Sequence, residues 1–108
     1  MTLYLADYAQ FKSKADMEEA IQLHISMHWK HMNNTDRAVL DIISLYSVDL
    51  GAAHLKHKII EMGVNKSNAT VRRTIRKLEK LEIIERIHYI RPIMSGLGAN
   101  IYVIKPFN

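Results

Sequence analysis

The chain has 108 residues, of which 48% are hydrophobic and 24% are charged. This composition fits one small globular domain and excludes general disorder. The chain has no cysteine, which excludes a disulfide framework and a thiolate metal site. No apolar run approaches the roughly 18 residues of a membrane span, and the opening residues lack the basic region and long apolar stretch of a signal peptide. We therefore expect a cytoplasmic protein with no membrane partner.

The charge is divided unequally between the two halves of the chain. Residues 1–50 carry four basic and seven acidic side chains, a net charge of −3. Residues 51–108 carry eleven basic and four acidic side chains, a net charge of +7. Such asymmetry indicates a polyanionic partner for the second half, most often nucleic acid. A soluble domain that happens to be basic would show the same asymmetry.

The first half reads as an irregular lead-in followed by two helices. Ser13 is placed to cap a helix that begins near Lys14 and is broken at residues 33–35. Asn34 or Thr35 is expected to cap the next helix, at about 36–47. That helix is apolar almost all round, so we place it at the centre of the domain. We divide the chain into an N-terminal extension and helix, 1–34, and a main domain, 35–108.

The second half alternates short helices and strands. A short strand is predicted at 53–55, and a short helix at 56–62 is expected to stop at Gly63 in the left-handed conformation. Ser67 is placed to cap a long helix that runs to about Leu81. Strands are predicted at 83–91 and 101–104, with a loop at 92–100 between them. The predicted class is therefore mainly α with a small β-hairpin (α+β).

This order of elements is that of a winged helix-turn-helix, here with an extra N-terminal helix. A winged helix-turn-helix places its second helix in the major groove of DNA, with apolar residues on the buried side and donors on the other. Val71, Ile75 and Leu78 form the apolar stripe of the long helix. From the exposed side of the helix and from the hairpin we predict DNA contacts by Lys66, Ser67, Asn68, Thr70, Arg72, Arg73, Arg76, Lys77 and Arg91.

Four stretches carry a resemblance to a known family: 51–55, 67–73, 78–85 and 96–104. Over about residues 35–105 the chain resembles a winged helix-turn-helix DNA-binding family of Firmicutes and their phages and plasmids, of the replication or regulatory type. The resemblance implies DNA binding, with Ser67, Asn68, Thr70, Arg72 and Arg73 as the recognition-helix positions. That family usually carries glycine after the recognition helix, where this chain has Glu82. Because a left-handed exit is sterically costly for glutamate, we expect the helix to run further before Ile83.

Three histidines, His24, His28 and His31, lie on one face of the first predicted helix at spacings of four and three. Imidazoles at this spacing can ligate zinc or nickel. The same stripe also suits packing against the domain or against a second copy. We predict a structural role with no metal and no cofactor. With Trp29 beside the stripe, we also predict a homodimer contact through residues 14–32.

Catalytic motifs are missing from the sequence. The chain has no cysteine nucleophile or serine elbow, and its Gly96-Leu97-Gly98 lies between predicted strands rather than before a helix. We therefore expect that the chain is not an enzyme. The expected function is sequence-specific binding of double-stranded DNA, in transcription regulation or as a replication or plasmid-maintenance accessory. The long helix, about 67–81, would enter the major groove, and the hairpin 83–104 would form the wing.

A second function class stays open beside DNA binding. The same scaffold could be a protein-interaction module whose basic helix docks an acidic protein partner. The apolar Met94 and Leu97 in the hairpin loop and the acidic first half of the chain favour this alternative.

Overall fold

The computed structural model describes residues 9–47, 50–87 and 100–107. In chain order its elements are α1 (Lys14–Met27), a 3-10 segment η2 (Trp29–His31), α2 (Asn34–Leu45), β1 (Ala52–Leu55), α3 (His57–Val64), α4 (Asn68–Lys80), β2 (Ile84–Ile87) and β3 (Asn100–Ile104). The described part of the chain is therefore mainly helical with a small antiparallel sheet, which confirms the expected α+β class. None of its helices is long and apolar enough to cross a membrane.

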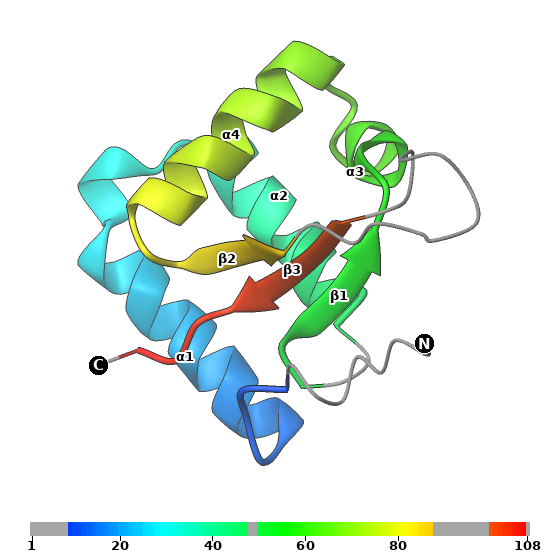
Figure 1. Cartoon of the computed structure of the whole chain (residues 1–108). Coiled ribbons are helices and arrows are strands. Elements are labelled where there is room, and N and C mark those ends of the chain that lie inside the picture. The colour runs from blue at the N-terminus through cyan, green and yellow to red at the C-terminus, as the bar shows by residue number, and fades with distance from the viewer. Residues whose placement is uncertain (1–8, 48–49, 88–99, 108) are drawn as a thin grey trace, which may run out of the picture.

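The sheet has three strands in the order β1-β3-β2, with β3 in the middle (Figure 1). Both neighbours run antiparallel to β3, and Tyr102 pairs with Ala53 on one side and Arg86 on the other. The short strand predicted at 53–55 is thus confirmed, and it joins the two strands of the predicted hairpin. β3 begins at Asn100, one residue before the predicted start. The predicted loop residues 92–99 lie outside the described residues.

One hydrophobic core joins the helices to a face of the sheet. In the view of Figure 1, α4 and α3 lie above the sheet, and α1 lies below it beside the C-terminal end of the chain. The buried members of this core are Met17, Ile21, Met32, Val39, Leu40, Ile43, Ala53, Leu55, Ile60, Val71, Ile75, Leu78, Ile83, Ile84, Tyr102 and Ile104. α1 therefore packs into the same core as the other described helices and the sheet. The boundary that we predicted at residue 34 stays a prediction.

Side-chain caps explain where the helices begin. Ser13 accepts a hydrogen bond from the Asp16 amide, and Ser67 accepts one from the Thr70 amide, so both predicted serine caps are confirmed. The cap predicted for the second helix was wrong by one or two residues. Asn33 caps α2 through a capping box, in which its side chain and that of Asp36 each accept from the other's amide. α2 consequently begins and ends about two residues earlier than predicted.

The first helix is shorter than the sequence predicted. α1 ends at Met27, and residues 29–31 form the 3-10 segment instead of another α-helical turn. The predicted stripe of histidines therefore does not continue at α-helical spacing to His31.

The prediction that Gly63 stops the third helix was wrong. Gly63 lies inside α3, and the left-handed residue is Asn65, with φ of 55°. Asparagine tolerates this conformation better than most residues do. Gly63 instead allows a close approach, because a Cβ atom there would lie 2.7 Å from Cδ1 of Ile42 in α2. The glycine thus serves helix packing rather than helix termination.

The expectation that α4 runs further before Ile83 was also wrong, because the helix ends at Lys80. Glu82 adopts a left-handed conformation with φ of 60°. The Ile83 amide donates to the Leu78 carbonyl and the Glu82 amide donates to that of Glu79, which is the hydrogen-bond pattern of a Schellman motif. The sharp exit forms with glutamate in place of glycine because Ile83 and Ile84, which follow it, are both buried in the core.

Candidate nucleic-acid interface

The candidate interface is the outward face of α4. The helix turns Val71, Thr74, Ile75 and Leu78 into the core, where all four are buried. This inward spacing of three, one and three residues leaves the opposite side of the helix exposed. The predicted apolar stripe is confirmed, and Thr74 joins it by donating its hydroxyl to the Thr70 carbonyl at 2.9 Å.

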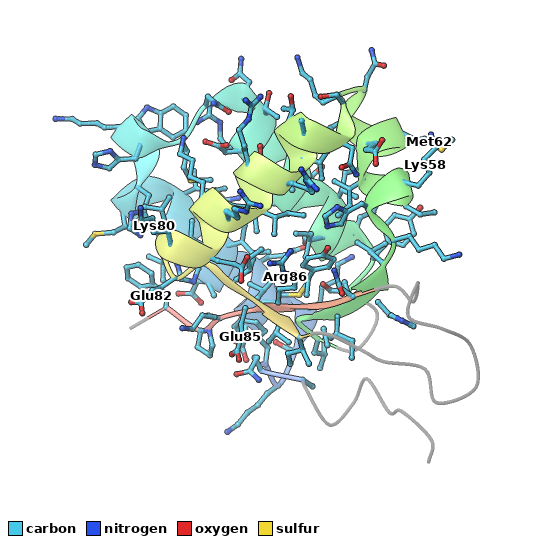
Figure 2. The ribbon with its side chains drawn as sticks, turned by 45° about the horizontal axis from the view of Figure 1, so that its top comes forward. Lys58, Met62, Lys80, Glu82, Glu85 and Arg86 are labelled. Atoms are coloured by element: carbon cyan, nitrogen blue, oxygen red, sulfur yellow. The ribbon has the colours of Figure 1, made fainter. Side chains whose placement is uncertain are left out.

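Three arginines occupy the outward side of α4. Arg72, Arg73 and Arg76 are exposed, and within the described residues none of them forms an ion pair. The Arg73 guanidinium donates a long hydrogen bond of 3.4 Å to the Thr70 hydroxyl. Lys80 extends the basic face at the end of the helix (Figure 2). Lys66 is exposed just before the helix begins. These cations are free to meet an anionic surface.

Lys77 has a different environment from the arginines. Its Nζ lies 2.6 Å from a carboxylate oxygen of Asp36, whose side chain is only 2% exposed. The same carboxylate oxygen accepts the Asn33 amide of the capping box. Lys77 therefore ties α4 to the start of α2, and its charge is largely used within the fold.

The polar residues at the start of α4 are also engaged in local contacts. The Ser67 hydroxyl lies 3.1 Å from the Thr70 hydroxyl and caps the helix. The side-chain amide of Asn68 donates from Nδ2 to a carboxylate oxygen of Glu61 in α3 at 3.0 Å, which links the two helices. Both side chains remain at the surface. Arg91, the predicted hairpin contact, lies outside the described residues.

A group of side chains that the sequence analysis missed lies beside this interface. His57, the first residue of α3, stacks on Tyr102 of β3, with ring centroids 6.3 Å apart and an interplanar angle of 27°. Arg86 of β2 lies between α4 and the sheet (Figure 2), and one of its nitrogens lies 3.7 Å from a Glu79 oxygen. Arg86 lies two residues after the core residue Ile84 in β2, so the two side chains point to the same face of the sheet. This period of two could have predicted from the sequence that Arg86 faces inward.

Burial and charge shift the titration of this group. Burial lowers the pKa of His57 below its ordinary 6.5. The nearby cations Arg86 and Arg72 lower this pKa further, while the Glu61 carboxylate raises it. Burial also raises the pKa of Tyr102. Both shifts favour the neutral form of the side chain.

The side chains of the three histidines in the predicted stripe do not point toward a common site. His24 is buried, its Nε2 lies 2.7 Å from the Lys105 carbonyl oxygen, and its ring meets the edge of Phe107. Burial lowers the pKa of His24, against the opposing effect of that hydrogen bond. His28 is half-buried and His31 is exposed. Among the described residues, no three histidine or acidic side chains come together as a metal site.

The predicted self-association face divides into a packed part and an exposed part. Met17, Ile21 and His24 of the stripe are buried within the domain. Met27 and Trp29 remain 68% and 59% exposed, and the Arg37 guanidinium lies over the Trp29 ring at 4.4 Å. Homodimerisation through residues 14–32 stays a prediction.

Comparison of the chain with protein-family models, with curated proteins and with solved structures finds no match in any of the three.

Proposed function

We propose that this chain binds double-stranded DNA as a winged helix-turn-helix protein, in transcription regulation or as a replication or plasmid-maintenance accessory. The observation that carries the proposal is the two-sided character of α4. Its apolar side is fully used by the core, and its other side presents Arg72, Arg73 and Arg76 without ion-pair partners among the described residues. A helix fits the major groove, and arginine is the residue that most often reads guanine there.

The arrangement of the other elements supports the same proposal. α3 and α4 are joined by a short turn through left-handed Asn65, and α2 packs behind both helices. β2 and β3 follow α4 as an antiparallel pair, with β1 completing the sheet. In this proposal α4 lies in the major groove and the β2–β3 hairpin lies against the sugar–phosphate backbone or the minor groove.

The contacts divide into those that read bases and those that bind phosphates. Arg73 lies within two turns of the Ser67 cap, near the end of the helix that approaches base edges. Arg72 and Arg76 lie on the shoulders of the helix, where the phosphate strands run. Lys77 contributes less than its charge suggests because Asp36 holds it.

The testing experiment is a set of binding titrations on a selected duplex and on a random duplex across a range of salt concentrations. We expect Arg73→Ala to weaken binding to the selected duplex more than to the random one, by about 1–3 kcal/mol of discrimination. Arg76→Ala and Arg91→Ala should weaken both equally, and each should lower the salt slope by roughly one. Lys14→Ala, which removes an exposed cation from the start of α1, is the matched control.

Each result bears on a separate part of the proposal. Equal losses on both duplexes for Arg73→Ala would show that another residue faces the bases. No binding to either duplex at low salt would exclude the DNA-binding function.

A protein partner is the second candidate function, and one observation favours it. Met62 of α3 is 72% exposed beside the basic helix (Figure 2), and such an apolar side chain suits a protein contact better than a phosphate. In this case the basic helix would dock an acidic protein surface. Binding to duplex DNA that weakens steeply with salt would exclude it as the principal function.

A further inference from the structure

A groove between α1 and α2 lies outside the proposed nucleic-acid interface. It has a volume of about 730 Å³ and is lined by side chains of both helices. Its floor is apolar, because Ile21 and Leu40 are buried there and Ile25 is half-buried. On the α2 side the small Ala38 lines the groove, and it leaves space that a larger side chain would fill.

The rim of this groove is acidic. Glu18, Glu19 and Asp41 line it, all three are exposed, and none of them forms an ion pair within the described part of the chain. Arg37 also lines the groove, but its guanidinium donates to a backbone carbonyl at 2.9 Å and to the side-chain oxygen of Asn34 at 2.7 Å. The lining thus offers three unpaired carboxylates against one guanidinium that already has partners in the fold.

The groove and the basic face of α4 lie on different sides of α2. Asp36 of α2 pairs with Lys77 of α4, and Asp41 follows five residues later. At 3.6 residues per turn, this separation places the two carboxylates about 140° apart around the helix axis. A ligand in the groove would therefore leave the exposed arginines of α4 accessible.

Shape and charge together define the kind of ligand that fits. The lining runs from residue 34 to residue 44 of α2, a length of about 15 Å, which is close to three turns of a third helix. An apolar floor suits the recognition mode in which an amphipathic helix lays its apolar face into a groove. The carboxylates of the rim favour lysine or arginine on either side of that face.

We propose that the groove between α1 and α2 docks an amphipathic helix of a partner protein, whose apolar stripe is flanked by lysine or arginine side chains. The inference is independent of the DNA-binding proposal, because no residue of α4 lines the groove. A second copy of this chain is a poor occupant in a symmetric contact. Its own groove would bring Glu18, Glu19 and Asp41 against the same three carboxylates.

The test uses the full chain and a synthetic peptide of leucine and lysine, about 14 residues long, patterned so that the leucines fall on one helical face. A second peptide has the same composition in scrambled order. Trp29, the only tryptophan of the chain, lies under the guanidinium of Arg37 at the groove, so its fluorescence reports binding. We expect saturable binding of the patterned peptide and about tenfold weaker binding of the scrambled one.

Separate variants test the charge and the shape of the groove. Asp41→Lys should weaken binding of the patterned peptide by about threefold to fivefold at low ionic strength, through the loss of an exposed ion pair. Glu85→Lys makes the same change of charge at an exposed site in β2 and should leave binding unaltered. Ala38→Phe fills the groove without a change of charge and should also weaken binding, which keeps the inference testable if Asp41→Lys does not fold. Circular dichroism checks the fold of each variant.

Four results would overturn the inference. No binding of the patterned peptide at low ionic strength excludes the site, and equal losses for Asp41→Lys and Glu85→Lys show that only net charge matters. Equal binding of the two peptides, or unaltered binding in Ala38→Phe, excludes a helix in the groove. A dimer in sedimentation of the wild type that is lost in Ala38→Phe makes a second copy the occupant instead. The DNA-binding proposal survives each of these results.

Discussion

Two helices of this chain bury side chains at the same spacing, and the fold uses them differently. α1 buries Met17, Ala20, Ile21 and His24, and α4 buries Val71, Thr74, Ile75 and Leu78. In α1 a histidine occupies the last of these inward places, so the side chain with binding chemistry becomes part of the packing. In α4 the corresponding inward position is occupied by Leu78, and the arginines lie on the exposed side of the helix.

The comparison shows when a regular pattern of polar side chains indicates a binding face. A helix has one stripe to contribute to the core, and whatever lies on that stripe is desolvated. His24 lies on it, is only 4% exposed and uses Nε2 on the Lys105 carbonyl. A polar stripe is available to a ligand where a separate apolar stripe anchors the same helix, as in α4.

The largest expected effect would test Lys77, the cation of α4 that forms an ion pair with the buried Asp36. Asp36→Ala removes both the partner of Lys77 and the capping box of α2. We expect a loss of about 2–3 kcal/mol in the free energy of unfolding, from one charge-assisted hydrogen bond and one helix cap. Urea denaturation measures it. Asp41→Ala, at an exposed position of the same helix, should change stability by less than about 0.5 kcal/mol. Equal effects of the two variants would show that Lys77 is as free as the arginines.

The next effect would test the packed histidine of α1. His24→Ala removes the hydrogen bond to the Lys105 carbonyl and the edge contact with Phe107. We expect a loss of about 1–3 kcal/mol in the free energy of unfolding, because a part-buried carbonyl is left without its partner. His31→Ala, on the exposed 3-10 segment, is the control and should be nearly neutral. A neutral result for His24→Ala would show that the C-terminal segment is held by other contacts.

A smaller effect, of opposite sign, is expected where α4 leaves the core. Glu82→Gly relieves a left-handed glutamate, with φ of 60°. It should raise the free energy of unfolding by about 1 kcal/mol, since glycine adopts this conformation without a Cβ clash but loses more backbone entropy on folding. Glu85→Gly, at an exposed site in β2, should instead destabilise the protein. Denaturation midpoints of the two variants should move in opposite directions, and a fall for both would contradict the role assigned to residue 82.

The smallest expected effect is that of metal removal, which should not change the melting temperature. Dialysis against a metal chelator should leave the melting temperature unaltered, because packing separates the roles of His24, His28 and His31. Added zinc should not raise the melting temperature either. A fall of several degrees on chelation, restored by zinc, would mean that the histidine stripe binds metal after all.

Prediction from sequence succeeded where the cause is local. Ser13 and Ser67 cap helices because a hydroxyl three residues before an amide can accept its hydrogen bond, whatever the rest of the chain does. The inward stripe of α4 follows from helical periodicity in the same way. The order of helices and strands and the α+β class came from these local signals, as did the outward position of Arg72, Arg73 and Arg76.

Tertiary structure decided the features that join distant parts of the chain. Lys77 meets Asp36 across 41 residues, and His24 meets the Lys105 carbonyl across 81. Gly63 serves the approach of Ile42, and Glu82 takes a strained conformation because the buried strand that follows must enter the core. His57, Tyr102 and Arg86 meet only when α3 packs on the sheet. No local periodicity encodes such contacts, because burial and charge depend on what the folded chain places alongside each residue.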